Sequence, residues 1–311
     1  DLSTRLHGGR EMTMSVRSSA LVAGLIFAFE SLRSLHAGLP PAMLEKLDQP
    51  ALDVLETSVT VLSSSRMPLP KGGSVEQSAF EADFDFTRRI SLRGPWYLAL
   101  GLSYETFAFG RTAGGLPDRL QGIAGIVALQ YVVQDHVAAT LELRPGVYSS
   151  GRISSEALDV PVLAYAPIPL RSNLFLLLGA RVSGLQTPPV APIGGLIWLI
   201  RDDLRLEAIF PQSHLVYSPN DRWEYLLEAE IAGDGFRVDR DPALPARQRG
   251  AAVEYSEYRA GAGINFTPRR GTTIGLDAGY VFERSLDFFR ARTDLRSGGS
   301  VFLRLQGSVE F

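Results

Sequence analysis

The sequence predicts an all-β protein, a single antiparallel transmembrane β-barrel of about fourteen strands, with twelve strands as the alternative. Three observations predict it: apolar and polar residues alternate in segment after segment, the alternating segments are long, and one of them reaches the final Phe311. Alternation with period two is the pattern of a strand with one apolar and one polar face. A tilted strand needs about ten residues to cross a bilayer, whereas strands of soluble proteins average five or six.

Composition excludes several other classes. Of the 311 residues, 45% are hydrophobic and 21% are charged, whereas a helical membrane protein of this size would be far more apolar. The net charge of −3 and the pI near 5.9 argue against nucleic acid as a partner. The chain has no cysteine, which rules out disulfides, thiol catalysis and thiolate metal ligands.

The amino-terminal region predicts export. Arg17 supplies a positive charge, residues 21–29 form an apolar run of signal-peptide length, and Ala37 marks a cleavage site. We therefore expect residues 1–37 to be upstream residues plus a removed signal peptide, 38–54 a periplasmic lead-in, and 55–311 the outer-membrane barrel. The residues before Met14 suggest an over-extended gene start.

The alternation is clearest over residues 80–90. One face carries Phe80, Ala82, Phe84, Phe86 and Ile90, and the other carries Glu81, Asp83, Asp85, Thr87 and Arg89. The pattern recurs over residues 96–105, 137–144, 223–231, 258–266, 274–282 and 301–311. Aromatic residues lie near the predicted strand ends, as in the girdles of membrane barrels: Trp96, Tyr104, Trp223, Tyr225, Phe266, Tyr280 and Phe282. A large soluble β-sandwich would show the same alternation, so the export signal and the last strand decide between the two.

Connections alternate between short and long, as periplasmic turns and outer loops do. Short ones are expected at 94–95, 134–135, 170–171, 202–203, 219–221 and 268–270, and longer ones at 65–74, 111–118, 149–155, 239–250 and 285–298. Residues 190–218 are interrupted by prolines, and merging strands there gives the alternative count of twelve. No connection looks long enough to form a plug domain.

The last predicted strand carries an assembly signal. Leu305, Val309 and Phe311 share its apolar face. An amphipathic edge strand that ends in an aromatic residue is a template for strand addition. We therefore expect the barrel-assembly machinery to be a partner during biogenesis.

Four further segments resemble an outer-membrane β-barrel family that is catalogued only as a domain of unknown function. They are residues 193–211, with Ile193-Gly-Gly-Leu-Ile-Trp198, residues 218–225, residues 258–264 and residues 277–284. The resemblance covers most of the chain after residue 55. It implies the fold and the outer-membrane location of a Gram-negative bacterium, and it brings no catalytic residues.

The polar face of the strands is expected to line the lumen. Its acidic members are Glu81, Asp83, Asp85, Glu105, Glu142, Glu207, Glu224, Glu228, Glu230, Glu257, Asp277, Glu283 and Glu310. Its basic members are Arg89, Arg144, Arg181, Arg205, Arg222, Arg259 and Arg304. Charges of both signs form ion pairs across neighbouring strands, and the acidic surplus makes any open path favour cations. The alternative is a closed lumen in which the charges are fully paired.

The sequence offers no constellation for catalysis. Ser213 and His214 are neighbours on a strand, so their side chains point to opposite faces and do not form a nucleophile and its base. His7, His36 and His136 have no such neighbour. Asp234, Asp239 and Asp241 match no ordered calcium loop, and we expect solvated carboxylates there. We therefore expect no enzyme activity, no metal and no cofactor.

The first hypothesis for function is porin-like passive diffusion of small solutes through a narrow, weakly cation-preferring lumen. The second is a closed structural or surface-interaction barrel with a charge-paired lumen, and an outer-membrane hydrolase is the third. The expected partners are outer-membrane lipid and lipopolysaccharide, small solutes, and no nucleic acid.

Overall fold

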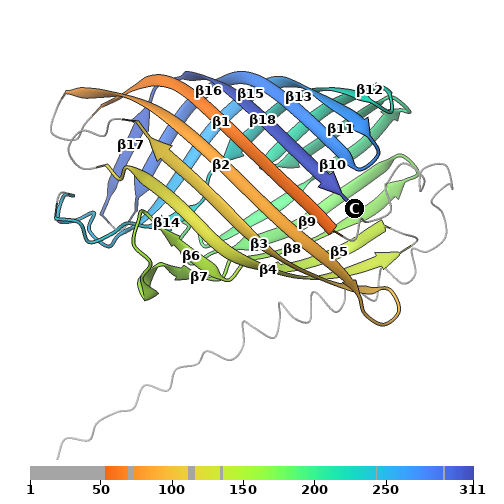
Figure 1. Cartoon of the computed structure of the whole chain (residues 1–311), viewed down its shortest axis with the longest axis horizontal. Helices are drawn as coiled ribbons and strands as arrows, with labels where there is room; N and C mark the ends of the chain where they lie inside the picture. Colours follow the sequence, from red (N-terminus) through yellow and green to blue (C-terminus); the bar gives the residue numbers. More distant parts are fainter. Residues whose placement is uncertain (1–52, 69–72, 111–115, 134–135, 243, 290) are drawn as a thin grey trace, which may run out of the picture. The chain divides into compact units, whose positions relative to one another are not determined.

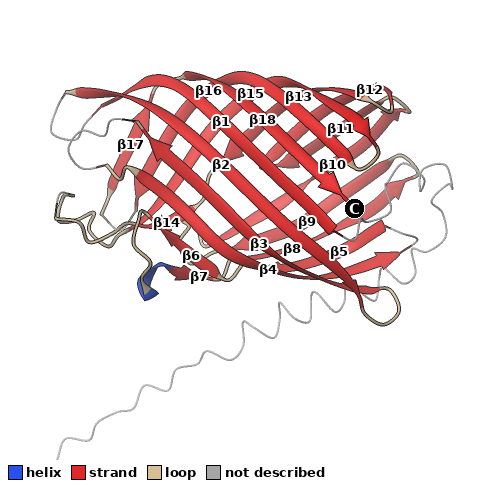
Figure 2. Ribbon diagram, viewed as in Figure 1, coloured by secondary structure: helices blue, strands red, loops and turns tan. Residues whose placement is uncertain are grey.

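The computed structural model describes residues 53–311 apart from 69–72, 111–115, 134–135, 243 and 290. The expected signal peptide and lead-in therefore fall almost wholly outside the described residues. The strands are β1 Asp53–Pro68, β2 Ser74–Ser91, β3 Trp96–Phe109, β4 Arg119–Val133, β5 His136–Leu143, β6 Gly146–Ser149, β7 Leu158–Asp159, β8 Val162–Arg171, β9 Leu174–Val182, β10 Val190–Arg201, β11 Leu204–Phe210, β12 Gln212–Asn220, β13 Trp223–Ala232, β14 Gly235–Arg237, β15 Ala252–Arg269, β16 Thr272–Phe288, β17 Thr293–Ser297 and β18 Ser300–Glu310. One 3-10 turn, η1, spans Ser155–Ala157 (Figure 2).

Fourteen antiparallel strands close a ring (Figure 1). Their order is β1, β2, β3, β4, β5, β8, β9, β10, β11, β12, β13, β15, β16 and β18, and β18 pairs again with β1. Backbone hydrogen bonds of 2.9 and 3.0 Å join Asp53 to Phe311 at this closure. The predicted barrel of fourteen strands is confirmed, and the alternative of twelve is not, because β10, β11 and β12 stay separate strands. Across the described residues the structure contains no helix of the length and hydropathy that a membrane-spanning helix requires.

The two ends of the barrel differ in their connections. The end where Asp53 and Phe311 meet is called the terminal end, and the opposite end is called the loop end. Five of the six predicted short turns lie between strands at the terminal end, and the sixth, 134–135, lies outside the described residues. The loop end carries the five predicted longer connections and also two that the sequence did not predict, 183–189 and Pro211. Gly271 shows why one terminal turn needs glycine: its φ is +75°, and a Cβ would lie 2.5 Å from the carbonyl oxygen of Glu310.

The outer surface of the barrel is apolar. Large hydrophobic side chains are exposed on all sides of the ring, among them Val59, Val61, Phe80, Phe84, Leu102, Ile123, Leu178, Trp198, Leu227, Ile264, Leu276, Phe282, Leu303 and Leu305. They alternate with inward residues along each strand. Such a surface cannot face water over its whole circumference without a large free-energy cost, whereas contact with lipid satisfies it.

The interior at the loop end is also apolar. A core of buried residues fills it, drawn from strands and from the loop-end connections: Leu62, Met67, Ala79, Phe107, Phe109, Leu116, Leu120, Ala124, Tyr148, Leu185, Phe236, Val238, Leu244, Ala251, Ala252, Val253, Tyr255, Val281, Leu286, Phe288, Ala291, Leu295 and Phe302. The connection between β13 and β15 supplies Phe236, Val238 and Leu244. The expectation was that no connection is long enough to form a plug domain; a few apolar side chains of this connection nevertheless help to fill the lumen.

A bulge changes which face some residues of β16 occupy. The register between β15 and β16 shifts between Tyr258 and Arg259, so the pairing skips one residue of β16. As a result Arg284 points inward and is fully buried. Glu283, which we expected on the inner face, instead pairs with the exposed Arg296 at 3.1 Å. That expectation was wrong because an extra residue in a strand inverts the alternation beyond it.

Candidate functional site

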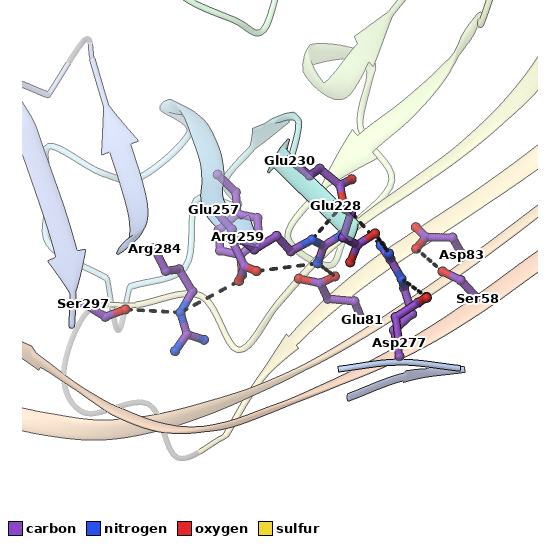
Figure 3. Close-up of polar contacts among 12 residues, drawn as sticks. Ser58, Glu81, Asp83, Glu228, Glu230, Glu257, Arg259, Asp277, Arg284 and Ser297 are labelled. Atoms are coloured by element: carbon purple, nitrogen blue, oxygen red, sulfur yellow. Dashed lines mark hydrogen bonds and ion pairs between the residues drawn. The ribbon is translucent and has the colours of Figure 1, made fainter. Parts of the chain in front are cut away.

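A band of buried charges crosses the lumen between the apolar core and the terminal end, and Figure 3 shows polar contacts among its members. We call it the charge network; it comprises Glu81, Glu228, Glu230, Glu257, Arg259, Asp277, Arg284 and Arg304. Its members come from β2, β13, β15, β16 and β18. Alternation places them inward, and closure of the ring brings together residues far apart in the sequence.

Arg259 is the first centre of the network. Its Nη1 lies 3.0 Å from Glu81 Oε2 and its Nε lies 3.0 Å from Glu230 Oε2. Glu257 Oε2 is 3.8 Å from the same Nη1. Glu81 is on β2 and Arg259 on β15, with three strands of the ring between them, so this contact crosses the lumen. The guanidinium also lies 5.6 Å from the ring centroid of Phe302, at the base of the apolar core.

Arg304 is the second centre. Its Nε lies 3.0 Å from Asp277 Oδ2 and its Nη1 lies 3.2 Å from Glu230 Oε2. Its Nη2 donates to Glu228 Oε2. Glu230 therefore bridges the two arginines, and the network is one connected unit. Charge-assisted hydrogen bonds of this kind are stronger than neutral ones, above all where water is excluded.

Arg284 is the third cation and has few charged partners. It donates to Ser65 Oγ at 2.8 Å and to the carbonyl oxygen of Gln77 at 3.2 Å. Its Nε lies 3.3 Å from Ser297 Oγ and 4.0 Å from Glu257 Oε1. The alternation in the sequence does not indicate that this residue lies on the inner face, because only the bulge in β16 turns it inward.

A polar chamber lies between the charge network and the terminal end. One cavity of about 390 Å³ is lined by Glu56, Thr57, Ser58, Asp83, Phe84, Asp85, Asn265, Thr273, Gly275, Gln306, Gly307 and Ser308. A second of about 290 Å³ is lined by Val54, Glu56, Asp85, Thr87, Arg89, Ala99, Ile126, Ala128, Gln130, Glu142, Arg144 and Tyr165. The two share Glu56 and Asp85. The lining holds four carboxylates and two guanidiniums, so its walls are acidic on balance.

Hydrogen bonds fix the charged side chains of the chamber walls. Arg144 contacts Asp85 Oδ2 at 3.1 Å and Glu142 Oε1 at 2.6 Å. Asp83 accepts a hydrogen bond of 2.9 Å from the Ser58 hydroxyl, and Arg89 donates one of 2.7 Å to Gln130.

Glu105 lies in the same interior, beside the chamber wall. Glycine at position 122 leaves room for it, since a Cβ there would lie 2.6 Å from Glu105 Oε1. Its carboxylate thus occupies space that a side chain on β4 would otherwise fill.

A smaller polar ladder runs along β11, β12 and β13. Arg205 bonds to Glu207 at 2.8 Å and to Glu224 at 3.2 Å, and His214 Nδ1 lies 3.5 Å from Glu207. Ser213 donates to the carbonyl oxygen of Ile209 at 3.0 Å. Ser213 and His214 therefore have separate partners and do not form a nucleophile–base pair.

The loop end is closed by contacts between connections from opposite sides of the ring. One parallel bridge pairs Ser149 of β6 with Arg237 of β14. Asp239 accepts a 2.8 Å hydrogen bond from the Arg152 amide and donates its own amide to Ser150 Oγ at 2.9 Å. These bonds hold β6 and the β14 connection together over the apolar core.

The remaining acidic groups near the loop end are also engaged. Asp234 accepts from Arg181 and, at 3.1 Å, from Gln186. Among the residues that the structure describes, no cluster of three His, Asp or Glu side chains is arranged to hold a metal ion. The inward residues predicted from sequence thus fall into separate groups: the charge network, the chamber walls, the ladder and these loop-end contacts. Arg222 and Glu310 lie at strand ends and are exposed.

Comparison with known proteins gives a likeness of fold. No family model matches the chain, and no curated protein matches it in sequence. The predicted resemblance to the family of unknown function stays a prediction. Among solved structures, an outer-membrane channel from Pseudomonas putida F1 has 12% identity and a TM-score of 0.46, over 88% of this chain and 100% of that one. A Pseudomonas aeruginosa FadL homologue has 12% identity and a TM-score of 0.42, over 89% of this chain and 94% of that one. The P. putida toluene transporter TodX has 12% identity and a TM-score of 0.38, over 88% of this chain and 93% of that one. Scores at this level carry no argument about function.

Proposed function

We propose that the protein lies in the outer membrane and gives small solutes a narrow, weakly cation-preferring passage, which is closed in the described arrangement. The terminal end faces the periplasm and the loop end faces outward. A solute enters the polar chamber and goes further only when the contacts at the loop end separate. The observation that carries this proposal is the order of layers in the lumen, from chamber to charge network to apolar core.

The inner face of β2 supports the order of these layers. Asp85 and Asp83 line the chamber, Glu81 belongs to the charge network, and Ala79 belongs to the apolar core. β18 repeats the order with Gln306, Arg304 and Phe302. An apolar core raises the free energy of any hydrated ion in the lumen, so passage requires that the core be displaced.

The apolar outer surface supports the location. Strands of 14–18 residues with exposed hydrophobic side chains are long enough to cross the apolar band of a bilayer, about 25 Å tall, with a tilt of about 40°. Paired aromatic side chains such as Trp223 and Phe266, with ring centroids 4.6 Å apart, lie near the strand ends at the terminal end. Aromatic rings at such positions favour the boundary between lipid and water.

A closed structural barrel is the second candidate. The observation that favours it is the complete burial of inward residues at the loop end: Tyr255, Phe288 and Val253 have 0% exposure. A permanently open pore would leave such lining residues in contact with water. The two candidates differ only in whether the loop-end contacts ever separate.

Single-channel conductance in a planar bilayer, under a salt gradient, tests the proposal. The matched variant carries S150C and D239C. These substitutions place one thiol on each of two residues that are joined by a 2.9 Å hydrogen bond from the Asp239 amide to the Ser150 hydroxyl. The chain has no other cysteine, so a disulfide forms only there. We expect cation-selective openings from the wild type, none from the oxidised variant, and recovery on reduction.

Each outcome separates the candidates. A refolded wild-type barrel that never conducts would overturn the passage and leave the closed structural barrel. Conductance that persists in the oxidised variant would show that the path does not depend on separating these contacts.

A further inference from the structure

The charge network contains more negative than positive charge. Five carboxylates face three guanidiniums, an excess of two negative charges. Four of the carboxylate side chains (Glu81, Glu228, Glu257 and Asp277) expose 3% or less of their surface. Unbalanced charge in such a place has a high free energy, because neither water nor a partner compensates for it.

Buried oxygens without a hydrogen-bond partner occur on both sides of the network: Glu228 Oε1 and Asp277 Oδ1 belong to the carboxylates that bind Arg304, and two others lie near Arg259. Glu81 Oε1 and Glu257 Oε2 are buried and accept no hydrogen bond. Both carboxylates approach the same nitrogen, Arg259 Nη1, at 3.0 and 3.8 Å. Thr60 Oγ1, also buried and unpartnered, belongs to the cross-strand neighbour of Glu81 on β1. The two carboxylates share one guanidinium nitrogen, and a hydroxyl without a partner lies on the neighbouring strand. The cations of the network therefore do not neutralise this set of oxygen atoms.

We propose that Glu81, Glu257 and Thr60 form a binding site for a small monovalent cation of the alkali-metal class. Carboxylate and hydroxyl oxygens are hard ligands that suit such ions. A multiply charged metal fits less well, because no group of three or more acidic or histidine side chains in the described chain is placed to hold one metal ion. The inference deepens the proposed function, because it places a cation site within a cation-preferring lumen.

The polar chamber lies next to this site along β2. Asp83, whose carboxylate accepts only the Ser58 hydroxyl among the described side-chain bonds, lines the chamber two residues from Glu81 on the same face of β2. Figure 3 shows Asp83 and Ser58 beside Glu81 and the network. A cation in the chamber therefore meets a carboxylate only two residues from the site.

Thermal unfolding of the refolded barrel in detergent tests the site without any need for conduction. Sodium or potassium chloride replaces N-methylglucamine chloride at constant ionic strength, and the unfolding midpoint is followed. We expect the midpoint to rise with the small cation and to saturate. In E81Q and in T60V the apparent affinity falls by about tenfold or more, because a charged or polar ligand is lost. The control E283Q removes a surface carboxylate and keeps the wild-type response.

Direct location of the ion keeps the proposal testable if these variants do not fold. Crystals of the wild type soaked in thallium(I) should give an anomalous peak between Glu81 and Thr60. The absence of a peak at this position overturns the proposal. An unfolding midpoint that depends on pH but not on sodium also overturns it, because protons then balance the charge. An undiminished sodium response in E81Q overturns it too. A barrel that binds sodium but never conducts leaves the site standing and refutes only the passage.

Discussion

Replacing Arg304 by methionine tests how far the charge network stabilises the barrel. Arg304 exposes 8% of its side chain and binds Asp277, Glu228 and Glu230, which expose 0%, 1% and 15%. R304M leaves these carboxylates buried without their shared cation. Removing one partner of a buried ion pair costs about 3–5 kcal/mol, so we expect the free energy of unfolding to fall by at least this amount.

The matched control is R205M. Arg205 also binds two carboxylates, those of Glu207 and Glu224. The side chain of Arg205 is 38% exposed, and those of Glu207 and Glu224 are 27% and 32% exposed. Water screens such pairs, so the expected loss is about 0–1 kcal/mol. Both variants are measured by equilibrium denaturation of the refolded barrel, with the fluorescence of its three tryptophans as the signal.

A second substitution strengthens the test. E228Q removes one of the charges that R304M leaves uncompensated. The double variant should therefore lose about 0.5–3 kcal/mol less stability than the sum of the losses in the two single variants. If R304M loses no more stability than R205M, the network does not stabilise the fold and the reasoning is refuted.

Three further predictions concern the core and the chamber. F236A removes a fully buried ring and should lower the free energy of unfolding by about 3–5 kcal/mol, measured by the same denaturation. G233A should destabilise the barrel by about 1–3 kcal/mol, because the glycine has φ +125° and a Cβ would lie 2.0 Å from the Tyr255 carbonyl oxygen; a wild-type midpoint would contradict this. Neutralising Asp83 and Asp85 together should shift the reversal potential toward zero under a salt gradient, and an unchanged potential would exclude them from the path.

The sequence predicts the fold well wherever the two faces of a strand differ in polarity. In β2, Phe80 and Phe84 face outward while Glu81 and Asp83 face inward, as the alternation predicts. In the half of the barrel near the loop end this contrast disappears. Phe302 of β18 is buried in the apolar core and Leu303 is exposed on the outer face, so both faces are apolar and the pattern gives no direction. For this reason the apolar core could not be predicted from the sequence.

The contacts of the charge network could not be predicted from the sequence. Alternation indicates that Glu81 and Arg259 point inward, but the partner of each depends on how the ring closes, over a separation of 178 residues. The sequence pattern does not indicate the bulge in β16 either. Because of this bulge, Arg284 lies on the inner face in place of Glu283. The face of a strand on which a side chain lies follows from the local sequence. Its partners across the lumen depend on how the whole barrel closes.

Water reaches the chamber but not the buried interior toward the loop end. Reaction of single cysteines with a water-soluble maleimide tests this difference most directly, because the natural chain has none. S58C lies in the chamber wall and should react rapidly, whereas A252C, at a position with 0% exposure, should be protected until the barrel unfolds. Equal reaction rates at the two positions would mean that water fills the lumen from end to end, and would contradict the closed interior.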